Sequence, residues 1–105
     1  MEFIETPAFT KIVKGLVGED EYRAFQNTLL EHPELGGRIP GALGMRKVRA
    51  PLGTQGKRGR LRIWYFHFEA RNQIFFVYAL PKNKGSDLTK AMERQLAQAA
   101  RKEFP

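Results

Sequence analysis

The sequence contains no cysteine among its 105 residues and only two histidines. The absence of cysteine excludes a disulfide framework, a thiolate nucleophile and a cysteine-ligated zinc site. Neither His32 nor His67 has a partner at metal-ligand or acid–base spacing, so both are expected to be structural. We therefore expect no metal and no cofactor, and a cytoplasmic location is the simplest interpretation.

Long hydrophobic runs are also missing. No apolar segment approaches the ~20 residues that a membrane span needs, and the acidic start at residues 1–5 does not resemble a signal peptide. The chain is nevertheless 42% hydrophobic and 11% aromatic, which is enough to form a core. We expect one domain over residues 1–105, with no membrane association.

Acidic residues are absent from one long segment. Residues 35–68 carry eight Lys and Arg and no Asp or Glu, although the whole chain has 11 acidic residues and a net charge of +7. The positive excess of the protein therefore belongs to this segment. Such clustering favours a polyanionic partner, with nucleic acid ahead of membrane headgroups and acidic proteins. The alternative is a solvated face that serves only solubility.

Apolar spacing predicts an α+β protein. A short strand at residues 3–5 precedes a helix capped by Thr6, and a second helix runs from Glu19 to the His32-Pro33 step. Residues 35–43 are expected to form a loop, followed by strands at 45–50, 62–68 and 73–80. A last helix should begin near Ser86 or Asp87, with its core-facing residues as follows: Leu88, Met92, Leu96 and Ala99. The predicted order is β-α-α-β-β-β-α, a small and mostly antiparallel sheet with an N-terminal helical hairpin on one face and a C-terminal helix.

Several fragments follow one another in an order typical of one family. They are Glu21-Tyr22-Arg23-Ala24-Phe25-Gln26, His32-Pro33-Glu34-Leu35-Gly36, Gly44-Met45-Arg46-Lys47-Val48-Arg49, Gly56-Lys57-Arg58-Gly59-Arg60-Leu61-Arg62-Ile63 and Lys82-Asn83-Lys84-Gly85-Ser86-Asp87-Leu88-Thr89. The chain resembles the RelE/HigB family of bacterial type II toxins, and the HigB branch most of all. The resemblance covers nearly the whole chain and implies a RelE-like fold.

The resemblance also implies an activity and partners. Such toxins are ribosome-dependent messenger RNA endonucleases that inhibit translation, and a cognate antitoxin neutralises them. The antitoxin commonly carries a DNA-binding domain, so operator DNA is contacted only through it. In the reaction that the family implies, the ribose 2′-OH attacks the adjacent phosphate without a metal.

Arg62 is the first candidate for a catalytic residue, because it matches the family arginine and its guanidinium can bind non-bridging phosphate oxygens. Lys82 matches a family lysine and is expected near Arg62 as a general acid or base, or else as a solvated turn residue. Lys57 in the glycine-rich loop is the third catalytic candidate, with a flexible charged tip as the alternative.

Further residues are candidates for RNA binding. Lys47 and Arg49 share one face of a strand, where phosphate contact is expected. Trp64 projects from the same face as Arg62, so it would either stack on a base or lie in the core. The remaining candidates are these: Arg46, Arg58, Arg60 and Lys84.

Two other functions stay open. ParE-like members of the same superfamily inhibit DNA gyrase, so the fold alone does not decide between the two activities. A non-catalytic RNA- or ribosome-binding module is the second alternative.

Overall fold

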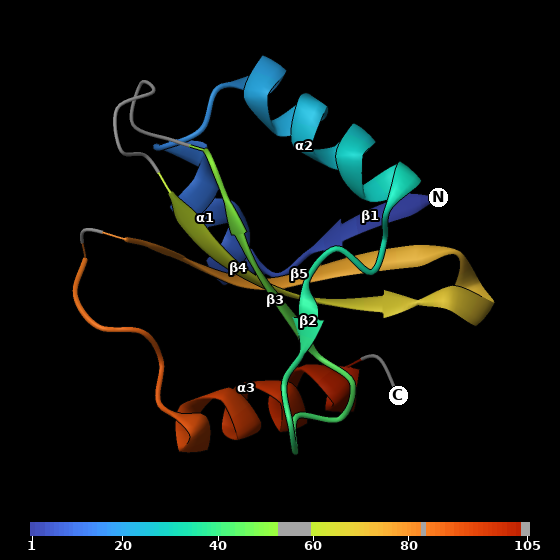
Figure 1. The fold of residues 1–105 in the computed structure, drawn as a ribbon, viewed down its shortest axis with the longest axis vertical. Coiled ribbons are helices and arrows are strands. Elements are labelled where there is room, and N and C mark those ends of the chain that lie inside the picture. The colour runs from blue at the N-terminus through green and yellow to red at the C-terminus, as the bar shows by residue number, and fades with distance from the viewer. Residues whose placement is uncertain (53–59, 83, 104–105) are drawn as a thin grey trace.

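The computed structural model describes residues 1–52, 60–82 and 84–103, and these residues form an α+β protein (Figure 1). Its elements follow in the order β1 (Glu2–Glu5), α1 (Pro7–Lys14), α2 (Glu19–Glu31), β2 (Gly37–Arg38), β3 (Arg46–Ala50), β4 (Leu61–Phe68), a 3₁₀ turn (Glu69–Arg71), β5 (Gln73–Pro81) and α3 (Lys90–Glu103). The predicted α+β class is confirmed. Within the described ranges, no helix is long and apolar enough to cross a membrane.

The strands form one mixed sheet in the order β1-β5-β4-β3-β2. β1 runs parallel to β5, whereas the other neighbours are antiparallel. β5 is a central strand, as its apolar residues on both faces predicted. A bulge between Trp64 and Tyr65 shifts the register of β4 against β5.

The segment 35–43, predicted to be a loop, contains the short strand β2. Gly36 makes this strand possible, because a Cβ there would lie 2.8 Å from the Lys47 carbonyl oxygen. The Gly36 amide donates to the Tyr65 hydroxyl (2.9 Å), which in turn donates to the Pro33 carbonyl (2.9 Å). The prediction missed β2 because two residues carry no readable alternation.

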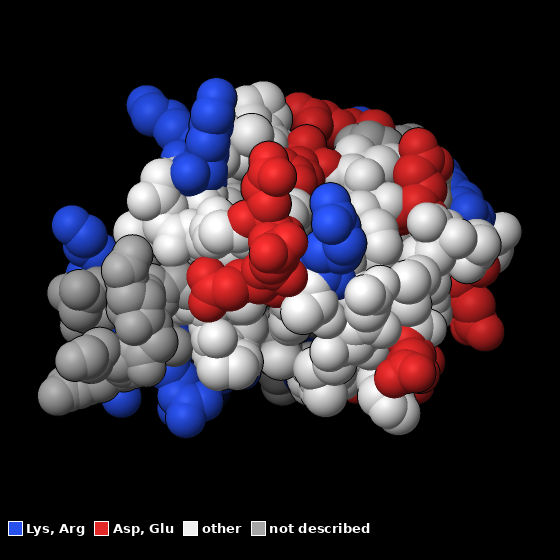
Figure 2. All heavy atoms as spheres, turned by 90° about the horizontal axis from the view of Figure 1, so that it is seen from above, with Lys and Arg blue, Asp and Glu red and all other residues white. Residues whose placement is uncertain are grey.

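Helices cover both faces of the sheet: α1 and α2 lie on one side and α3 lies on the other (Figure 1). The α1/α2 layer buries Phe9, Phe25 and Leu29 against Phe76, and the N-terminus of α1 is capped by the Thr6 hydroxyl as predicted. Figure 2 looks at this side and shows Asp and Glu gathered across its middle. The first turn of α2 contributes Glu19, Asp20 and Glu21, where the helix dipole favours them.

The last helix begins later than predicted. α3 starts at Lys90, and its cap is Thr89, whose hydroxyl accepts from the Met92 amide at 3.1 Å. Asp87 lies three residues before α3, and its carboxylate accepts from the Lys47 ammonium and the Leu88 amide instead of capping the helix. The predicted core-facing residues are half right: Leu88 and Leu96 pack partly buried against the core, whereas Met92 and Ala99 are exposed. The fully buried residues of α3 are Glu93, Ala97 and Ala100.

Candidate functional site

A pocket of about 490 Å³ opens where β3 and β5 end and β4 begins. Its described lining consists of Arg49, Arg60, Arg62, Lys82, Gly85, Ser86 and Asp87. The sheet register creates this cluster, because Arg49 pairs with Arg62 across β3 and β4, and the Lys82 amide donates to the Arg60 carbonyl (3.0 Å). Four of these lining residues are cationic and one is acidic, so the pocket suits an anion.

Arg62 is the most enclosed of the pocket cations, with 8% of its surface exposed. Its Nη2 donates to the carbonyl oxygens of Pro81 (3.0 Å) and Gly85 (3.2 Å), and its Nη1 lies 3.8 Å from Asp87 Oδ1. The buried Nε has no hydrogen-bond partner among the described residues. The guanidinium is thus fixed in place and still has donor capacity.

Lys47 is not part of the described pocket lining; its partly buried side chain lies on the α3 side of the sheet. Its Nζ donates to Asp87 Oδ2 at 2.6 Å and lies 3.5 Å from Glu93 Oε2. The same Glu93 oxygen accepts a 2.9 Å hydrogen bond from Trp64 Nε1, and the ammonium is 5.6 Å from the centroid of the Trp64 ring. The sequence predicted a phosphate contact for Lys47, but the structure gives its ammonium protein partners.

The Asp87 carboxylate connects Lys47 with Arg62. Burial alone would raise the pKa of Asp87, but hydrogen bonds from the Lys47 ammonium and the Leu88 amide, with the charges of Lys47 and Arg62, hold this pKa below its usual value. Asp87 is therefore ionised at neutral pH. A carboxylate stabilised in this way is a weak general base.

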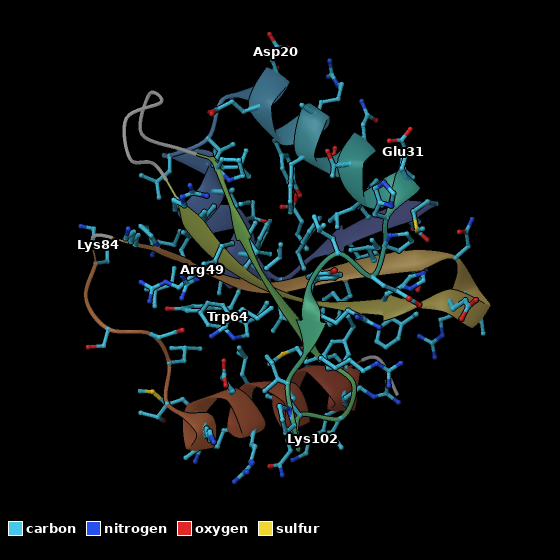
Figure 3. All side chains as sticks on the ribbon, viewed as in Figure 1. Asp20, Glu31, Arg49, Trp64, Lys84 and Lys102 are labelled. Carbon is cyan, nitrogen blue, oxygen red and sulfur yellow. The ribbon has the colours of Figure 1, made fainter. Side chains whose placement is uncertain are left out.

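The structure brings together four of the predicted site residues: Arg49, Arg60, Arg62 and Lys82. Lys84 is exposed, and Figure 3 shows it at the same end of the sheet as Arg49. The predicted catalytic Lys57 and the RNA-binding candidate Arg58 lie outside the described residues.

Two of the predicted RNA-binding residues are placed elsewhere. Arg46 pairs with Tyr65 in the sheet, on the α1/α2 side, and its Nη1 donates to the Gly36 carbonyl at 2.8 Å. Trp64 is fully buried between the sheet and α3 (Figure 3), so its ring presents no face to a base. The core interpretation of Trp64 is therefore the correct one. The alternation of β4 did place Trp64 and Arg62 on one face, as expected.

Sequence reasoning missed two acidic residues, Asp87 and Glu93. Asp87 was expected only as a possible helix cap, although it lies inside the Lys82–Thr89 motif. Glu93 has a readable signal: it precedes Ala97 and Ala100 by four and seven residues, so it shares their helix face. A carboxylate on the same helix face as buried alanines indicates that it has a polar partner inside the protein.

No group of three or more His, Asp or Glu residues in the described part of the chain is arranged to hold a metal ion. A comparison with models of known protein families finds no match for this chain.

Proposed function

We propose that this protein is the toxin of a type II toxin–antitoxin system and acts as a ribosome-dependent messenger RNA endonuclease. The observation that carries the proposal is the cationic pocket, in which Arg49, Arg60, Arg62 and Lys82 face a common space. A RelE-like fold is part of the proposal. It is supported by the helical hairpin on one face of the sheet and the C-terminal helix on the other.

The chemistry needs few protein groups. The ribose 2′-hydroxyl gives its proton to water as its oxygen attacks the adjacent phosphorus. The bond to the 5′-oxygen breaks, that oxygen takes up a proton, and the products are a 2′,3′-cyclic phosphate and a 5′-hydroxyl. Arg62 supplies fixed donors for the charge on the phosphorane, and Arg49 and Arg60 hold the neighbouring phosphates. The ammonium of Lys82 is a proton source for the leaving 5′-oxygen.

The proposed partners follow from the same pocket. The ribosome delivers and orients the messenger RNA, which offsets the lack of a strong base among the described lining residues. An antitoxin with an acidic segment would complement the cationic residues, and it would contact operator DNA through its own DNA-binding domain. The location proposed for this activity is the cytoplasm.

A translation extract with a defined messenger RNA tests the function. We expect ribosome-dependent cuts within the reading frame, read by primer extension, and a loss of cleavage rate of about 10²–10³-fold in Arg62→Ala. Arg62→Lys keeps the charge but loses the planar fork, so it should remain strongly impaired. Arg38→Ala is the matched control, because Arg38 is an exposed cation of the same acid-free segment on β2. Intact messenger RNA with normal translation would contradict the proposal and leave gyrase inhibition to be tested by DNA supercoiling.

A non-catalytic RNA- or ribosome-binding module is the second candidate. It is favoured by the low exposure of Arg62, whose Nη2 is engaged by two backbone carbonyls. In that case the extract would show stalled translation with uncut messenger RNA. Arg60→Ala would then weaken RNA binding more than Arg62→Ala, because Arg60 is the exposed residue of the two.

A further inference from the structure

Lys47 and Arg49 lie two residues apart on the same face of β3, yet their surroundings differ. Arg49 is exposed and lines the pocket. The Lys47 ammonium is held by Asp87 at 2.6 Å and by Glu93 at 3.5 Å, beside the ring of Trp64. The Lys47 charge is therefore already matched by carboxylates, whereas Arg49 has no ion-pair partner among the described residues.

Asp87 contacts both Lys47 and Arg62. One of its oxygens receives the Lys47 bond, while the other accepts the Leu88 amide and lies 3.8 Å from Arg62 Nη1. The Gly85 carbonyl accepts from Arg62 Nη2. The segment 85–88 is thus tied to β3 through Lys47 and to β4 through Arg62. Within this network, two cations are matched by the carboxylates of Asp87 and Glu93.

We propose that Lys47 is a positioning residue and not an RNA ligand: through Asp87 it holds the segment 85–88 against the guanidinium of Arg62. Its relevance to RNA rests on the proposed function, but the positioning itself does not. The charge offered to phosphates comes from Arg49, Arg60, Arg62 and Lys82. Lys47 fixes the geometry of one of them without contacting the ligand.

The positioning is tested by NMR on the ¹⁵N-labelled full chain, without RNA. We expect Lys47→Met to shift the Nε–Hε signal of Arg62 and to accelerate its hydrogen exchange, although Lys47 does not touch Arg62. Asp87→Asn, which changes the more exposed residue of the ion pair, should shift the Arg62 signal in the same way. The double variant should show no larger shift than either single variant. An Arg62 signal in folded Lys47→Met identical to that of the wild type would overturn the proposal. If Lys47→Met fails to fold, Lys47→Gln gives the same decision, because it also removes the ammonium and leaves Asp87 in place.

The absence of a phosphate contact is tested by the salt dependence of binding to a fluorescent single-stranded RNA oligonucleotide between 50 and 200 mM KCl. Arg49→Met should reduce the slope of log K against log salt by about 0.7, the value for one phosphate contact on a single strand. Lys47→Met should keep the wild-type slope. An equal reduction in both variants would overturn the proposal. A wild-type protein that shows no salt-dependent binding would count against the proposed function, while the NMR result would still decide the positioning.

Discussion

The two faces of the sheet are stabilised by different chemistry. On the α1/α2 face, Phe76 is fully buried and contacts five aromatic rings, including a stacked pair with Phe9 at 4.8 Å between centroids. On the α3 face, the helix contributes small Ala97 and Ala100, and a buried carboxylate from Glu93 meets Trp64 and Lys47. The core of the first face consists of packed aromatic rings, whereas the second face adds a buried ion-paired carboxylate to its apolar core.

This difference suggests different roles for the two faces, with the α1/α2 face contributing to stability and the α3 face connected to the pocket. The hydrophobic effect is non-directional, so it does not depend on the position of any one charge or proton. The α1/α2 layer therefore contributes mainly to the stability of the fold. A buried carboxylate is costly unless it is paired, so the packing of α3 includes the contacts of Glu93 with Trp64 and Lys47. Because the same network continues to Asp87 and Arg62, the position of α3 is coupled to the pocket.

Neighbouring phenylalanines of β5 provide the strongest test of this contrast. Phe76 points to the α1/α2 face and Phe75 to the α3 face, and both are almost completely buried. We expect Phe76→Ala to lower the free energy of unfolding by about 4–5 kcal/mol, since it loses core volume and several ring contacts. Phe75→Ala should cost about 3 kcal/mol in the same urea titration. An equal or larger loss at Phe75 would show that the aromatic cluster does not dominate stability.

The polar network gives a smaller expected effect. Glu93→Ala leaves Trp64 Nε1 without its acceptor and removes one carboxylate from Lys47, so we expect a loss of about 2 kcal/mol in unfolding free energy. Glu103→Ala on the same helix is the control, because Glu103 is exposed and its loss should stay within about 0.5 kcal/mol.

A double-mutant cycle makes this prediction specific. Trp64→Phe should cost less in the Glu93→Ala background than in the wild type, since the indole hydrogen bond is already absent there. Independent, additive losses would mean that the 2.9 Å contact contributes nothing to the docking of α3.

Local patterns were sufficient to predict much of the fold. The cap at Thr6, the spacing of Phe9 and Val13, and the β-prone runs before and after residue 70 each depend on neighbours in sequence, and each was correct. The parallel pairing of β1 with β5 joins residues about 70 positions apart, so local periodicity carries no information about it. The contact between Lys47 and Asp87 also joins residues far apart in sequence, so local patterns could not predict it either.

The candidate site was predicted only in part for a related reason. Alternation correctly placed Lys47 with Arg49 on one face of β3, and Arg62 with Trp64 on one face of β4. It could not distinguish the ion-paired Lys47 from the exposed Arg49, because the difference is made by Asp87 and Glu93 from a distant part of the chain. Charge counting likewise treats Arg46 as equivalent to the pocket cations, although it bonds to Gly36 on the other face.

The smallest expected effect concerns pH. The folded-state pKa of Asp87 is lowered, so its ion pair adds stability that is present above the ordinary Asp pKa of about 4 and is lost as the pH falls through the lowered value. Asp87 is about a third exposed, so we expect Asp87→Asn to cost less than about 1 kcal/mol at pH 7. The charged groups that face Asp87 are Lys47 and Arg62, and Glu93 on α3 faces Lys47; all three are present in both proteins.

Urea unfolding of the wild type and Asp87→Asn between pH 7 and pH 2 measures this contribution. The stability difference should be constant down to about pH 4 and then shrink toward zero. In the Lys47→Met background the same substitution should make a smaller difference, because the carboxylate has lost its nearest cation. A difference that grows on acidification would mean that the protonated form of Asp87 is the stabilising one. The ionic link between α3 and the pocket would then have to be rejected, and the contrast between the two faces of the sheet would depend on Glu93 and Trp64 alone.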